Sequence, residues 1–180
     1  MRGIDITDYD FTFKVMLLGE SSSGKENLIK LYVSGYFNED GKLTRGVDFS
    51  SKNINFKGKV VKLQFWDVTD DQRFRFLLSS YCAGSNGALV IFDIVNIKTL
   101  DRLTEWTQTV RERAGDIPIM LIGNENILGK PREISRAEGI KIAEKFNISG
   151  YSEISTETGK GIEEMFHNFT ALLFEKNKYL

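Results

Sequence analysis

The residues that decide the fold are 11–25, which read FTFKVMLLGESSSGK. Residues 11–18 form a short apolar run that is broken at Gly19. An amphipathic stretch follows, with apolar side chains at Leu28, Ile29, Leu31 and Tyr32. The pattern predicts a buried strand, a glycine-rich loop and a helix in direct succession. Such a loop follows the carboxyl end of its strand, where α/β proteins bind their ligands.

The loop has the pattern G-x-x-x-x-G-K. Its glycines let the backbone wrap closely, so that the amides point at phosphate oxygens, while the helix N-terminus adds partial positive charge. The lysine reaches the outer phosphates. The same residues are compatible with an ordinary turn rich in glycine and serine, but the strand–loop–helix context favours a phosphate loop. The residues assigned to it are Gly19, Ser22, Ser23, Gly24 and Lys25.

Apolar and amphipathic stretches alternate along the rest of the chain. Further strands are expected at 49–56, 60–67, 88–93, 117–123 and 151–154, and further helices at 99–113, from a capping box at Ser135 to about Phe146, and at 162–175. A hairpin turn, Lys57-Gly58-Lys59, joins the first two of these strands. We therefore expect an α/β domain with a six-stranded, mainly parallel sheet, one antiparallel edge strand and helices on both faces.

Length and composition fit one folded domain. The chain has 180 residues, of which 41% are hydrophobic and 27% charged, which excludes a disordered or low-complexity protein. With 24 basic and 25 acidic residues the net charge is −1, so the composition gives no sign of nucleic-acid binding. We expect an N-terminal extension at 1–10, the domain at 11–176 and a short tail at 177–180.

Several features of the sequence bear on where in the cell the protein is found. The single cysteine, Cys82, cannot form an internal disulfide, which favours a reducing compartment. No apolar run approaches the roughly 20 residues needed to span a membrane. The first ten residues do not resemble a secretory signal, and the last six offer no cysteine for prenylation. We expect a cytoplasmic protein with no lipid anchor of its own.

Residues 11–175 contain several further motifs in the order and at the spacing of a known protein family. They are Thr44-Arg45-Gly46-Val47-Asp48-Phe49, Lys62-Leu63-Gln64-Phe65-Trp66-Asp67, Arg73-Phe74-Arg75, Ser79-Ser80-Tyr81, Asn124 and Glu153-Ile154-Ser155. With the phosphate loop, they resemble the Ras-like small GTPases, most closely the Rab branch. The resemblance implies a P-loop NTPase G domain that binds GTP or GDP with Mg²⁺. It further implies nucleotide contacts from Phe37, Asn124, Ser155 and Thr156, and metal contacts from Thr44, Asp67 and the residue after Lys25.

The catalytic motifs depart from this pattern in charge. Relatives with activity carry serine or threonine after the lysine, whereas this chain has Glu26, which can ligate Mg²⁺ but adds negative charge beside the phosphates. At about 5 Å and an effective dielectric near 20, one such repulsion costs on the order of 3 kcal/mol. Asp70 and Asp71 replace the glycine and glutamine of the second switch. Because Asp71 only accepts hydrogen bonds when ionised, we expect no efficient GTP hydrolysis and assign no catalytic residue.

The base-reading motif is altered too. It reads Asn124-Glu125-Asn126-Ile127, so Ile127 replaces the aspartate that pairs with guanine. A hydrogen bond to a charged group contributes roughly 1.5–3 kcal/mol. Glu125 and Glu157 replace lysines. Two functions stay open: a protein-interaction module that binds guanine nucleotide weakly or not at all, and a Mg²⁺-dependent switch with slow, partner-assisted hydrolysis in which Glu26 ligates the metal.

Three aromatic residues, Phe49, Trp66 and Tyr81, match the exposed patch through which Rab-like proteins contact their effectors. Phe74 adds apolar surface nearby. Large aromatic side chains are the residues most often found at binding hot spots. The alternative is that these side chains pack under the switch helix. The resemblance therefore predicts protein effectors or regulators as partners.

Overall fold

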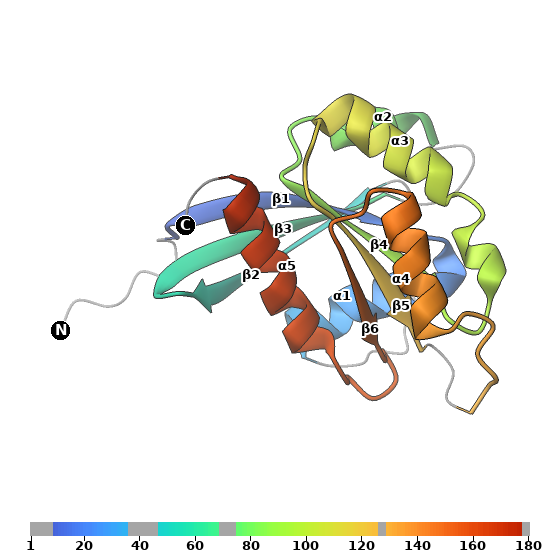
Figure 1. Ribbon diagram of the computed structural model, residues 1–180. Helices are drawn as coiled ribbons and strands as arrows, with labels where there is room; N and C mark the ends of the chain where they lie inside the picture. The colour runs from blue at the N-terminus through green and yellow to red at the C-terminus, as the bar shows by residue number, and fades with distance from the viewer. Residues whose placement is uncertain (1–8, 36–46, 69–74, 126–128, 178–180) are drawn as a thin grey trace.

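The computed structural model describes residues 9–35, 47–68, 75–125 and 129–177 (Figure 1). The strands are β1 (Phe11–Leu18), β2 (Val47–Phe56), β3 (Lys59–Val68), β4 (Gly87–Asp93), β5 (Ile119–Asn124) and β6 (Gly150–Ile154). They form one sheet in the order β2-β3-β1-β4-β5-β6. β2 and β3 are antiparallel and the other neighbours are parallel, which confirms the predicted fold class.

The helices connect these strands and cover both faces of the sheet. They are α1 (Lys25–Ser34), α2 (Arg75–Cys82), α3 (Leu103–Ala114), α4 (Arg136–Lys145) and α5 (Ile162–Lys176), with short 3-10 helices η1 (Ser21–Ser23) and η3 (Ile97–Leu100). α1 and α5 cover one face of the sheet, and α2, α3 and α4 cover the other (Figure 1). Their buried side chains belong to two separate core clusters, one on each face. Within the described ranges, no helix is long and apolar enough to cross a membrane.

One helix differs from the prediction. The expected helix at 99–113 is divided into η3 and α3, and polar side chains hold the first of these turns. The Asn96 side chain accepts from the Lys98 N–H, and Thr99 Oγ1 donates to the Asn96 carbonyl while accepting from the Asp93 N–H at 2.9 Å. These bonds hold residues 96–99 in a tight turn just beyond the end of β4. Helical periodicity alone did not indicate this break.

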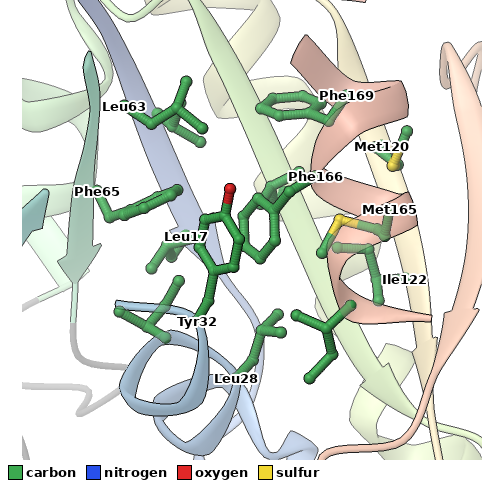
Figure 2. Close-up of a cluster of buried hydrophobic side chains, with 14 of the residues drawn as sticks. Leu17, Leu28, Tyr32, Leu63, Phe65, Met120, Ile122, Met165, Phe166 and Phe169 are labelled. Atoms are coloured by element: carbon green, nitrogen blue, oxygen red, sulfur yellow. The ribbon is translucent and has the colours of Figure 1, made fainter. Parts of the chain in front are cut away.

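The core on the α1 and α5 side is rich in aromatic rings. Figure 2 shows Tyr32 of α1 beside Phe166 of α5, and their ring centroids are 3.6 Å apart. Phe65 of β3 meets Phe166 edge-on at 5.5 Å. Leu63 and Phe65 are fully buried, since alternate residues of β3 point into this core. Packing of α1 against α5 fixes the position of the loop that precedes α1.

Candidate functional site

The phosphate loop has the backbone that an anion site requires. Gly19, at the end of β1, has φ 151°, and a Cβ atom there would lie 2.5 Å from the Ile91 carbonyl oxygen. Gly24 has φ 82° and starts α1 without a side-chain cap. The first N–H groups of α1 therefore face the end of the loop, as in helix termini that bind phosphate. The backbone fits the predicted function of the loop.

The lysine of the loop is held by another part of the protein. Lys25 is 3% exposed, and its Nζ donates to Asp67 Oδ1 and, at 3.2 Å, to the Val68 carbonyl. Burial raises the pKa of Asp67, and the neighbouring charges of Glu26 and Asp48 raise it further, while the charge of Lys25 lowers it. Lys25, which the loop pattern predicts as a phosphate ligand, is therefore paired with a buried carboxylate of the protein.

Three carboxylates line one pocket beside this ion pair. Glu26, Asp48 and Asp67 border a hollow of about 200 Å³ together with one lysine, Lys30, and apolar side chains of α1. Asp48 faces Asp67 directly in the antiparallel register, an arrangement that places like charges opposite each other. In the described part of the chain, no three His, Cys, Asp or Glu side chains are grouped to hold a metal ion.

Asp48 was not singled out as a site residue from the sequence. The feature of the sequence that could have identified Asp48 is the hairpin turn between β2 and β3. Lys57 and Gly58 both have positive φ, 49° and 76°, so the turn has two residues and Phe56 pairs with Lys59. The expected three-residue turn, which included Lys59, was wrong by one residue. Counting back from the two-residue turn places Asp48 opposite Asp67.

The predicted base-side residues are brought together by hydrogen bonds. Asn124 is fully buried, and its Nδ2 donates to the Ser23 carbonyl at 2.9 Å and to Thr156 Oγ1 at 3.1 Å. Its Oδ1 accepts from the Thr156 N–H at 3.1 Å. Ser155 Oγ donates to the Glu125 carbonyl at 3.2 Å. Asn124 therefore ties the phosphate loop to the loops after β5 and β6.

Ser23 carries a buried hydroxyl that no described residue satisfies. Its side chain is fully buried, and Oγ has no hydrogen-bond partner within the described ranges, whereas Ser22 beside it is exposed. We expect Ser23→Ala to raise the free energy of unfolding by about 1 kcal/mol, because an unsatisfied polar group is removed. Urea unfolding in nucleotide-free buffer measures this change.

The matched control for Ser23→Ala is Ser135→Ala. The Ser135 hydroxyl accepts the Glu138 N–H in the capping box that opens α4, as the sequence predicted. Its loss is expected to lower the free energy of unfolding by about 1 kcal/mol. A decrease at Ser23 comparable to that at Ser135 would contradict the assignment of an unsatisfied hydroxyl.

The predicted aromatic residues form one cluster. Phe49 of β2 and Trp66 of β3 are cross-strand partners with ring centroids 4.5 Å apart, and Tyr81 of α2 lies 5.4 Å from Trp66. Phe49 is 55% exposed and Phe76, also on α2, is 70% exposed. Lys14 of β1, which the sequence did not indicate, places Nζ 4.0 Å from the Trp66 ring centroid. The remaining predicted site residues lie outside the described residues: Phe37, Thr44, Asp71 and Phe74.

Comparison with known proteins assigns the chain to a family. Residues 14–175 match the Ras family. The chain is 38% identical to Ras-related protein Rab-4A of Homo sapiens, and equally to that of Rattus norvegicus, over 159 residues, 88% of this chain and 72% of each relative. It is 34% identical to Ras-related protein RGP2 of Oryza sativa subsp. japonica over 160 residues, 88% of this chain and 73% of the relative. The chain therefore belongs to the Ras family of small GTPases, with its relatives in the Rab branch.

Proposed function

We propose that this Rab-like G domain binds guanine nucleotide weakly or not at all and acts as a protein-interaction module through its aromatic cluster. The observation that carries the proposal is the buried ion pair between Lys25 and Asp67. The pair gives the loop lysine a counter-ion from the protein. A phosphate group would have to displace that counter-ion.

Displacement is unfavourable because of the neighbouring charges. When Lys25 leaves Asp67, a buried carboxylate loses its partner, which is costly in a low-dielectric environment. Glu26 and Asp48 raise the pKa of that carboxyl, and the described acidic side chains that border the pocket outnumber Lys30, the described lysine that borders it. A polyanion binds best in a positive field. Both effects oppose the entry of a triphosphate.

The carboxylates as arranged do not fit a divalent cation. One oxygen of Asp67 is engaged by Lys25, and the described residues form no group suited to a metal ion. We therefore assign no step of a reaction to Mg²⁺ in this site. Asp71, in place of the glutamine that orients water, further supports the loss of efficient hydrolysis.

A second candidate function is supported by the loop backbone. Gly19 and Gly24 retain the conformation of a phosphate loop, and the start of α1 is uncapped. If Glu26 ligates Mg²⁺, the protein is instead a GTP- and GDP-binding switch with slow, partner-assisted hydrolysis. The two functions differ in one quantity, the affinity for nucleotide.

Unfolding in the presence of nucleotide separates the two functions. A ligand that binds only the folded state at 1,000 times its Kd stabilises the protein by about 4 kcal/mol. We expect millimolar GTP with Mg²⁺ to leave the midpoint of urea unfolding unchanged, because the ion pair excludes the phosphates. GDP and ATP serve as parallel samples. A stabilisation of several kcal/mol by GTP or GDP would support the switch and contradict the proposal.

A further inference from the structure

The aromatic cluster continues onto an open face of the sheet. Alternate residues of a strand lie on the same face of a sheet. The register of β1, β2 and β3 therefore defines the residues that share a face with Phe49 and Trp66, which is the face on which α2 packs. Beyond the aromatic pair, the polar side chains on this face include Ser51, Asn53, Lys62, Gln64 and Lys14. The face thus leads from aromatic to polar residues along the strands.

The charged side chains that the strands present on this face are lysines, while Asp10, just before β1, is paired with Lys59 and accepts the Val60 N–H. Among the described residues of β1, β2 and β3, the charged side chains on this side are Lys14 and Lys62, and α2 contains no acidic residue. Lys14 Nζ donates to the Ala83 carbonyl at 2.8 Å, close to Trp66. Lys62 lies toward the other end, with Nζ 4.9 Å from the ring centroid of Tyr9. The face thus carries one lysine, Lys14, at the end of the aromatic pair and a second, Lys62, toward the other end.

A hollow connects the two ends. A pocket of about 380 Å³ is bordered by Phe49, Ser51, Lys62, Gln64 and Trp66. Trp66 and Lys62 are four residues apart on β3, a separation of about 13 Å at the rise of an extended strand. Two turns of an α-helix span about 11 Å. A helix with an apolar residue over the aromatic pair can therefore place a side chain two turns away near Lys62.

We propose that this face binds an acidic segment of a partner protein, with an apolar anchor on Phe49 and Trp66 and an aspartate or glutamate at Lys62. The inference rests on the proposed function in using the same aromatic cluster. Charge complementarity supplies the choice of partner, because the cations of the face attract carboxylates and repel basic segments. Apolar contact supplies affinity, and the lysines favour acidic over basic segments.

A randomised library of helical peptides tests the chemistry without knowledge of the natural partner. Peptides are selected on the whole chain, on Lys62→Glu, and on the control Lys98→Glu, which changes an exposed lysine of η3 by the same charge. We expect peptides selected on the unaltered chain to be enriched in Asp and Glu over the starting library. Lys62→Glu should weaken a selected peptide about tenfold, while Lys98→Glu leaves it unchanged.

Each alternative result has a definite meaning. Selected peptides without an acidic excess, binding unaffected by Lys62→Glu, or failure to enrich any peptide would overturn the proposal. Association with phosphatidylserine vesicles that Lys62→Glu abolishes, without binding of acidic peptides, would assign the face to a membrane instead. These readouts do not depend on nucleotide, so GTP binding would overturn the proposed function and leave this inference standing.

Discussion

Combining Glu26→Ser with Ile127→Asp is expected to raise the affinity for GTP and GDP by a factor of about a thousand to ten thousand. The first change removes a repulsion of roughly 3 kcal/mol beside the phosphates. The second restores a charged hydrogen-bond acceptor for guanine, worth roughly 1.5–3 kcal/mol. The sum, about 4.5–6 kcal/mol, corresponds to three to four powers of ten in Kd. Titration of labelled GTP, GDP and ATP in Mg²⁺ buffer measures the change.

The matched control places the same substitutions far from the loop. Glu112 is exposed on α3 and Ile140 is 40% exposed on α4, so Glu112→Ser with Ile140→Asp changes charge equally. This control should leave nucleotide affinity unaltered. ATP should gain less than GTP from the restored aspartate, which pairs with guanine alone. If Glu26→Ser with Ile127→Asp leaves affinity untouched, the charge of Glu26 and the missing aspartate are not the reason that the pocket disfavours nucleotide.

Lys25→Met is expected to lower the free energy of unfolding by about 3–5 kcal/mol, because it leaves a buried carboxylate without its partner. Asp67 is 6% exposed and already lies in the field of Glu26 and Asp48. Adding Asp67→Asn should recover much of the loss, since the double variant buries no unpaired charge. Urea unfolding of the two single variants and the double variant gives the coupling free energy. Lys141→Met, at an exposed position on α4, is the control.

The loss in Lys25→Met should depend on pH. The pKa of Asp67 is raised in the folded protein, and removing Lys25 removes the charge that lowers it. A raised folded pKa gives stability that is present at low pH and is lost as pH rises through that pKa. The deficit of Lys25→Met should therefore shrink as the pH falls from about 7 to about 5. A deficit independent of pH, or additive single changes, would contradict a coupled buried pair.

Much of the fold could be predicted from local patterns. Gly19 marks the end of β1 because only glycine tolerates its φ and the closeness of the Ile91 carbonyl. The capping box at Ser135 identified the start of α4. The break after η3 was missed, because the helical spacing of Leu100, Leu103 and Trp106 continues through it. α2 was not expected from periodicity either.

The residues of the site could be predicted from the sequence, but their arrangement in space could not. The sequence indicated Lys25 and Asp67 separately, yet their pairing depends on β1 and β3 lying side by side in parallel register, a nonlocal contact. Asp48 needed the correct two-residue turn, and one residue of error transfers every side chain of β2 to the other face. The contact of Lys14 with Trp66 also depends on β1 and β3 being neighbours in the sheet.

The most direct test of the ion pair as a substitute for phosphate is the nucleotide content of the purified chain. The protein is purified in Mg²⁺ buffer, denatured, and the released nucleotides are separated and quantified. A site that binds weakly loses its ligand during purification, because dissociation is fast. We predict no guanine nucleotide above background. Recovery of close to one GDP or GTP per chain would contradict the claim that Asp67 holds Lys25 in place of phosphate.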